Sequence, residues 1–137
     1  MSEREIEYRK PATDWQTLAY WEGCGRGELV LQRCGDCGAV QHRPRGLCAT
    51  CLSSALEHFV ASGRGQVHTF TVTHQNGQSA FRNACPYVLA YVDLEEGPRL
   101  MTNVVGCEPD AVHIGMEVRV DFVATEKGLG VPRFVPA

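Results

Sequence analysis

The chain has no long apolar run, and its first residues lack the features of an export signal. No segment approaches the roughly 18 to 20 consecutive apolar residues that a membrane-spanning helix requires. Met1–Glu5 has neither the basic stretch nor the apolar segment of a signal peptide. We therefore expect a cytoplasmic protein with no membrane association.

Lysine is scarce, with Lys10 and Lys127 the only two among thirteen basic residues, and the formal net charge is −3. Binding to nucleic acid depends on many basic side chains that neutralise phosphates, which this composition does not favour. The charge is also uneven. Residues 26–64 hold five arginines and three acids, whereas residues 86–126 hold eight acids and two arginines. The second half is therefore a poor nucleic-acid surface.

The 137 residues are 44% hydrophobic and 21% charged, which is ordinary for one globular domain with at most a small added module. Seven cysteines is an odd number, and a disulfide framework is not expected without an export signal. The cysteines therefore indicate a different chemistry.

Four cysteines form two pairs, Cys34/Cys37 and Cys48/Cys51, separated by ten residues. Two residues between thiolates allow a tight turn to aim both sulfurs at one point, and two such turns supply a tetrahedron. Gly38 follows the first pair, where such a turn needs a residue that tolerates positive φ. A redox motif would need only one pair. The spacing predicts a structural Zn²⁺ site, because four cysteines leave no coordination position open for catalysis.

The other titratable residues form no recognisable catalytic motif. Cys24 and Cys107 are expected to be small buried hydrophobes, and so is Cys85, for which a nucleophilic role is the alternative. The histidines are scattered and are expected to be solvated or structural: His42, His58, His68, His74 and His113. We expect no catalytic residues, and so no catalytic site of the chain's own.

A helix is expected from Thr13, as N-cap of a capping box with Gln16, to about Gly23. Its apolar residues fall on two faces, one with Trp15, Leu18 and Ala19 and the other with Tyr20, Trp21 and Cys24. Either the helix is buried between two parts of the protein, or one face packs internally while the other meets a partner chain. The candidate partner-binding residues are Trp15, Tyr20 and Trp21.

Beyond residue 66 the pattern is that of β-strands. Five strands are expected at about 67–74, 86–94, 99–105, 116–124 and 128–135, with turn signals between them. Five short strands in about seventy residues are typical of a Greek-key barrel of the OB type. The expected fold is mainly β, with an arm and helix (1–27), a rubredoxin-like zinc ribbon (28–61) and a five-stranded OB-type barrel (62–137).

The chain resembles the family of rubredoxin-like zinc-ribbon and OB-fold proteins associated with acyl-CoA metabolism, formerly catalogued as a domain of unknown function. Besides both cysteine pairs, the resemblance rests on residues 20–23, 27–34, 62–65, 86–88, 100–106 and 114–120. Two departures are small. Ala49 stands where members often have proline, and His42 stands where they often have an aromatic residue.

This resemblance implies a non-catalytic accessory subunit that binds and supports a thiolase-like or lipid-transfer-type enzyme, an aldolase or thiolase acting on acyl- or steroid-CoA thioesters. It also implies that a hydratase or acyl-CoA itself is a candidate partner. Arg26, Arg33, Arg43 and Arg45 are candidates for contact with CoA phosphates, although solvated or structural arginines are the simpler interpretation. The alternatives are a nucleic-acid-binding ribbon and barrel, and a CoA-thioester-binding protein or enzyme that acts alone.

Overall fold

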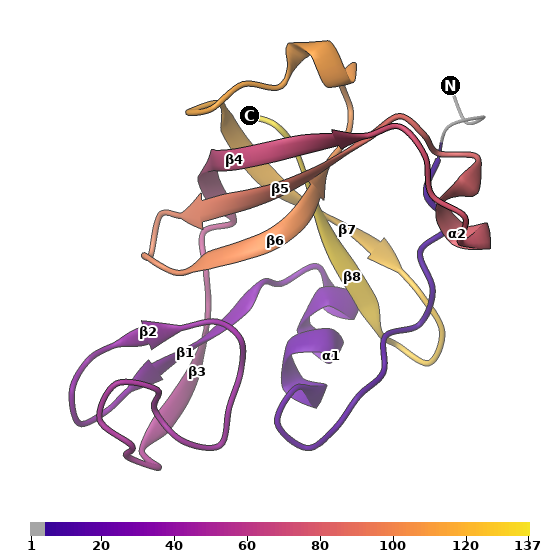
Figure 1. The fold of residues 1–137 in the computed structure, drawn as a ribbon. Helices are drawn as coiled ribbons and strands as arrows, with labels where there is room; N and C mark the ends of the chain where they lie inside the picture. Colours follow the sequence, from indigo (N-terminus) through magenta and orange to yellow (C-terminus); the bar gives the residue numbers. More distant parts are fainter. Residues whose placement is uncertain (1–4) are drawn as a thin grey trace.

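The computed structural model describes residues 5–137 (Figure 1). A short helix and a three-stranded sheet form one half, and a five-stranded barrel forms the other. In chain order the elements are α1 (Leu18–Arg26), β1 (Val30–Cys34), β2 (Val40–Gln41), β3 (Leu56–Val60), β4 (Arg64–Thr73), α2 (Ser79–Arg82), β5 (Tyr87–Leu94), β6 (Arg99–Val104), η2 (Pro109–Ala111), β7 (Glu117–Ala124) and β8 (Gly130–Pro136). The mainly β prediction is confirmed.

The predicted start of the helix is wrong. The helix α1 begins at Leu18 with Thr17 as its N-cap, and no side chain makes a capping hydrogen bond there. Asp14 instead holds the turn before the helix, because its Oδ1 accepts hydrogen bonds from the backbone N–H groups of Gln16 (2.9 Å) and Thr17 (3.0 Å). The side chain of Gln16 accepts a 2.9 Å hydrogen bond from the backbone N–H of Gly46, a tertiary contact that the local sequence does not reveal.

The helix also ends later than predicted. It continues through Gly23 and stops at Gly27, whose φ of +82° is the left-handed conformation that closes many helices. Gly23 and Gly25 are needed for close packing. A Cβ added to Gly25 would lie 1.9 Å from the carbonyl oxygen of Gly128, which precedes β8.

The ribbon sheet has the order β2-β1-β3, with both pairings antiparallel. Gln32 of β1 is a buried polar residue, 4% exposed, and its amide is fully used. Its Oε1 accepts from the Arg45 backbone N–H (2.9 Å), and its Nε2 donates to the Arg45 carbonyl (2.9 Å). The loop that carries Arg45 is thereby fixed to the sheet. The strand that closes this sheet is β3, which pairs with β1 along its whole length.

The barrel is closed in the order β4-β5-β6-β8-β7, which confirms the OB-type prediction. All pairings are antiparallel except that between β6 and β8, where Val104 pairs with Phe134. Along β5 the residues Val88, Ala90 and Val92 are buried, whereas Leu89 and Tyr91 on the opposite face are exposed. The loop between β4 and β5 contains the short helix α2.

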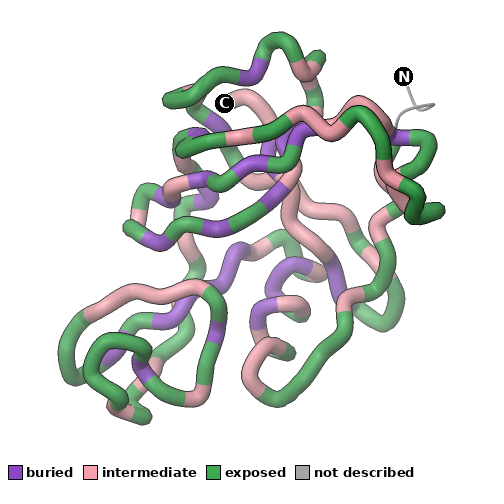
Figure 2. The backbone as a smooth tube through the Cα atoms, in the orientation of Figure 1, coloured by how far each residue is buried: buried purple, intermediate pink, exposed green. Residues whose placement is uncertain are grey.

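One continuous core joins the two halves. Tyr20 and Cys24 of α1, and Leu29 and Leu31 around β1, belong to the same buried cluster as Val92, Val118 and Phe134 of the barrel. Figure 2 shows buried positions along the inner side of α1 and along the barrel strands, while the ribbon loops are mostly exposed. Because α1 packs against β1, β7 and β8, it ties the ribbon to the barrel.

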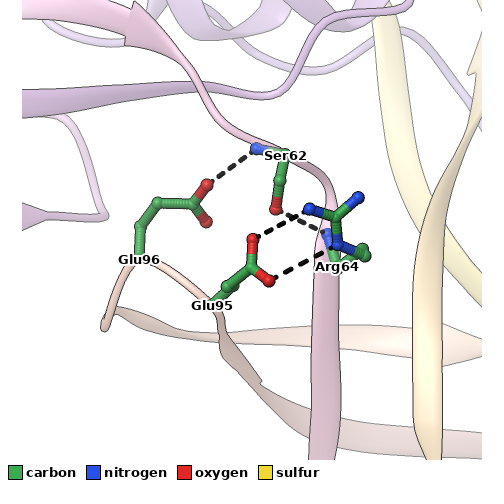
Figure 3. A network of polar contacts seen from close by, with 4 residues as sticks. All are labelled: Ser62, Arg64, Glu95 and Glu96. Carbon is green, nitrogen blue, oxygen red and sulfur yellow. Dashed lines mark hydrogen bonds and ion pairs between the residues drawn. The ribbon is translucent and has the colours of Figure 1, made fainter.

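The connection from the ribbon to the barrel is held by polar contacts (Figure 3). Glu96 accepts a 2.7 Å hydrogen bond from the Ser62 backbone N–H, and Glu95 pairs with the Arg64 guanidinium at 3.2 Å. Both acids lie in the β5–β6 turn.

The division into residues 1–27, 28–61 and 62–137 remains a prediction. None of the described helices has the length and apolar content needed to cross a bilayer.

Candidate functional site

Two turns of the same design bring the four predicted ligands together. In the first, the Gly38 N–H donates to the Cys34 carbonyl (2.9 Å); in the second, the Leu52 N–H donates to the Cys48 carbonyl (2.9 Å). Gly38 has φ of +78°, as predicted, and Leu52 takes the same conformation with φ of +66°. The two turns therefore present their cysteines in matching geometry.

The sulfur positions fit a tetrahedral ion. The Sγ atoms of Cys34, Cys37, Cys48 and Cys51 all lie within 4.8 Å of one another. The Cys34–Cys51 and Cys37–Cys48 separations are both 3.6 Å. Four sulfurs at 2.3 Å from a tetrahedral Zn²⁺ would be separated by about 3.8 Å. These four cysteines would hold the ion without a large rearrangement.

The backbone also prepares the sulfurs to bind a cation. Cys34 Sγ accepts N–H groups from Asp36 (3.4 Å) and Cys37 (3.5 Å), and Cys48 Sγ accepts the N–H of Thr50 (3.4 Å). Hydrogen bonds from the Cys51 and Thr50 backbone lower the pKa of Cys48 to about 6. A backbone bond at Ser53 lowers the pKa of Cys51, but desolvation and the other three cysteines raise it to about 12. The other cysteines raise the pKa of Cys51, so a bound dication, which offsets part of the charge of four thiolates, would favour the deprotonated cluster.

The centre is a structural Zn²⁺ site of the ribbon. Cys34 and Cys48 are buried, and Cys37 and Cys51 are exposed, so the cluster lies at the surface of the small sheet. With four cysteines as ligands no position remains for water or substrate, and the ion supplies folding energy rather than chemistry.

The three candidate partner-binding residues lie in different environments. Trp15 is 79% exposed. Tyr20 is 4% exposed, within the core. Trp21 is partly buried against that core, and its Nε1 has no hydrogen-bond partner among the described residues. One face of the helical segment thus packs internally and the other faces outward.

The four candidate arginines divide into two pairs. Arg26 forms a 3.1 Å ion pair with Glu28, and the Arg33 guanidinium lies 4.1 Å from the centre of the Phe59 ring. Arg43 and Arg45 are exposed, and neither forms an ion pair with any residue in the range 5–137. Only the second pair is therefore free to meet an anionic group.

The remaining cysteines occupy structural positions. Burial raises the pKa of Cys24 to about 12. Cys85 donates to the Phe81 carbonyl at 3.6 Å, and desolvation raises the pKa of Cys107. The structure pairs His68 with Asp93 (3.2 Å) and places His42 beside Tyr20. These are packing contacts and a surface ion pair, and none of them is the contact with a general base that activates a nucleophile.

Sequence reasoning missed two features. Trp15 lies over Gly46 of the ribbon loop. The two residues are thirty-one positions apart, so no local sequence pattern predicts this contact. The N-terminal arm lines a groove of about 1090 Å³ beside β6 and β8. Tyr8 of the arm donates to Asn103 (3.1 Å), and burial raises its pKa to about 12. The alternation of charged and apolar residues at 5–9 was the available signal for an ordered arm.

Comparison with known proteins gives consistent matches along the chain. Residues 21–57 match the family described as "ChsH2, rubredoxin-like zinc ribbon domain", and residues 60–123 match "ChsH2, C-terminal OB-fold domain". The solved structure "Ltp2-ChsH2(DUF35) aldolase" contains a similar chain, with a TM-score of 0.82 and 38% identity. That match covers 93% of this chain and 98% of the other.

The curated relatives carry several descriptions. A "probable enoyl-CoA hydratase alpha subunit" of Thermomonospora curvata is 38% identical over 93% of this chain, which spans 40% of that protein. A "DUF35 domain-containing scaffold protein" of Methanocaldococcus jannaschii is 38% identical over 69% of this chain and 67% of its own length. "Benzoylsuccinyl-CoA thiolase subunit BbsA" of Geobacter metallireducens is 33% identical over 64% of this chain and 57% of its own length. The chain belongs to the DUF35 family of proteins with a ChsH2-type zinc ribbon and OB-fold domain.

Proposed function

We propose that the chain is an accessory subunit without a catalytic site of its own, which binds and supports a thiolase-like or lipid-transfer-type enzyme. The substrate class of that enzyme is an acyl- or steroid-CoA thioester. The observation that carries the proposal is the match, over 93% of this chain, to a chain of the Ltp2-ChsH2(DUF35) aldolase. A hydratase is a further candidate partner, since one relative is described as a hydratase subunit.

The contacts among the described residues favour a structural role in a complex over a catalytic role. The metal is enclosed by four sulfurs, and α1 links the ribbon to the barrel through one core. A rigid body with exposed side chains on its surface suits a protein that holds another chain in place. The use of four cysteines on a metal suits a reducing compartment, so the cytoplasm is the proposed location.

Co-expression with a thiolase-like or lipid-transfer-type enzyme of the source organism tests the proposal. We expect the two proteins to co-purify, and the enzyme to lose activity or solubility when it is expressed alone. The purified chain is expected to leave acyl-CoA thioesters intact. Failure to co-purify, with no effect on the enzyme, would overturn the proposal, as would thioester cleavage by the chain alone that is lost in Cys85→Ala.

A further inference from the structure

The helix and ribbon half exposes a tryptophan that is held in place. The six-membered ring of Trp15 lies against Gly46, and a Cβ added at that glycine would be 2.5 Å from Trp15 Cη2. The adjacent Gln16 side chain accepts the Gly46 N–H at 2.9 Å. The Trp15 ring is therefore exposed to solvent, while its position is fixed by the contact with Gly46 and by the hydrogen bond of the neighbouring Gln16.

The segment that carries Gly46 is equally well fixed. Exposure alternates along residues 43–47, so that Arg43, Arg45 and Leu47 are exposed while Pro44 is buried. Two hydrogen bonds of 2.9 Å hold the Arg45 backbone to the buried Gln32, as described above. We call Trp15, Arg43, Arg45, Gly46 and Leu47 the ribbon face.

The composition of the ribbon face is that of an interface centre. Tryptophan and arginine are the residues whose truncation most often weakens protein complexes, especially when they are rigid before binding. Leu47, the residue after Gly46 in the chain, is 50% exposed and adds apolar area to the ribbon face. Neither arginine has an acidic partner within residues 5–137, so both guanidinium groups remain available to carboxylates of another chain.

The barrel also exposes apolar side chains, but the charged residues beside them are paired. Tyr91 and Met101 lie opposite each other on β5 and β6, and are 45% and 59% exposed. The charged residues in the next register, Asp93 and Arg99, pair with each other at 2.5 Å, and Asp93 also pairs with His68. Among the described residues, the charged groups next to Tyr91 and Met101 include no unpaired cation, so charge complementarity favours the ribbon face.

We infer that the ribbon face is the docking surface for the enzyme subunit, which receives Trp15 in an apolar pocket rimmed by carboxylates that pair with Arg43 and Arg45. This inference rests on the proposed function and adds the place and the chemistry of the contact. It assigns these two arginines to protein carboxylates rather than to CoA phosphates.

Three variants test the surface against two matched controls, using the full zinc-loaded chain and the thiolase-like or lipid-transfer-type enzyme with which it is co-expressed. Trp15→Ala removes the anchor, Gly46→Ala displaces the ring without removing it, and Arg45→Glu reverses a free charge. Ile114→Ala alters a residue that is 68% exposed in the orange loop beyond β6 (Figure 1). Arg119→Glu reverses an exposed arginine on β7.

We expect Trp15→Ala and Arg45→Glu each to raise the Kd at least about tenfold, with Gly46→Ala weakening binding in the same direction. Both controls should stay within about twofold. Zinc content and thermal unfolding, measured for every variant, identify any loss that comes from misfolding.

These measurements distinguish an error in the proposed function from an error in the docking surface. If the unaltered chain does not bind the enzyme, the proposed function is overturned. If the unaltered chain binds and the folded ribbon-face variants bind equally well, the docking surface is wrong while the function stands. Titration of the isolated chain with CoA supplies a further outcome. CoA binding that is lost in Arg45→Glu would overturn the assignment of Arg45 to protein carboxylates.

Discussion

The imidazole of His42 lies against the phenol ring of Tyr20, with ring centroids 5.0 Å apart and planes inclined by 48°. Tyr20 comes from α1 and His42 from the end of the β2 segment, so the contact joins the helix to the ribbon. The Nδ1 atom of His42 is buried and has no hydrogen-bond partner among the described residues. A charge on this ring would be poorly solvated.

Stability is therefore expected to depend on the protonation of His42. Burial, with a smaller effect of the Arg43 charge, lowers its pKa from 6.5 to about 4. Between these two values the unfolded chain takes up a proton that the folded chain does not. The free energy of unfolding should thus fall as the pH falls through this window, by up to roughly 3 kcal/mol.

His42→Phe keeps an aromatic ring against Tyr20 and removes this titration. Urea unfolding of zinc-loaded protein at pH 7.5 and 5.0 should show a smaller loss of stability for the variant than for the unaltered chain. Comparing the two proteins removes the contribution of the cysteines, which is common to both. Equal losses would show that His42 does not titrate as its burial implies.

Gly25→Ala tests the close approach of α1 to the barrel. Alanine normally favours a helix over glycine by about 1 kcal/mol, so local preference alone predicts stabilisation. The added Cβ would instead meet the Gly128 carbonyl oxygen at 1.9 Å. We expect destabilisation of at least about 2 kcal/mol by urea unfolding. Gly77, which has no atom within 4 Å of such a Cβ, is the control; Gly77→Ala should change stability by less than about 0.5 kcal/mol.

Removal of the metal should unfold the ribbon. A strong chelator, or Cys48→Ser, is expected to abolish the bound zinc and the tertiary signal of the ribbon, because metal binding there is folding free energy. Cys85→Ser, outside the cluster, should retain the full zinc content. The measurements are metal analysis and near-ultraviolet circular dichroism. A stripped protein with an unchanged spectrum would contradict a structural role for the ion.

The two acids of the β5–β6 turn should differ in their effect on stability. Glu96 accepts the Ser62 backbone N–H at 2.7 Å, so Glu96→Ala removes a hydrogen bond to a charged acceptor and should cost about 1–2 kcal/mol. The side chains of Glu95 and Arg64 are 54% and 66% exposed, so Glu95→Ala should cost less than about 1 kcal/mol.

Glu96→Gln is the conservative control, since its amide oxygen can still accept from Ser62. It should recover most of the loss seen with Glu96→Ala in urea unfolding. Equal costs for alanine at positions 95 and 96 would show that the backbone contact does not hold the connection between ribbon and barrel.

Strand composition and cysteine spacing were sufficient to predict most of the architecture. The β-branched and aromatic residues at 86–94 identify β5 as a strand, but both of its faces are apolar, and only the fold turns Val88, Ala90 and Val92 inward. The spacing of Cys34, Cys37, Cys48 and Cys51 identifies the metal centre, because two short turns restrict where the sulfurs can lie. Both signals come from residues that are close together in the chain, so they can be recognised without the tertiary structure.

The helix shows where local signals were insufficient. Thr13 and Asp14 are both good caps, and three glycines offer places for the helix to stop. Packing decided both ends. Gln16 is engaged by Gly46 of the ribbon loop, and Gly25 is held inside the helix by its approach to Gly128.

The residues themselves thus determined the metal, the barrel and the family to which the chain belongs, because each depends on neighbours a few positions apart. Tertiary structure alone decided that Trp15 is exposed over Gly46 while Tyr20 is buried. It also decided that Arg26 and Arg33 have partners, whereas Arg43 and Arg45 have no ion pair within residues 5–137. These outcomes depend on contacts between segments that are far apart in the chain, and a surface that binds a partner is formed by the same kind of contact.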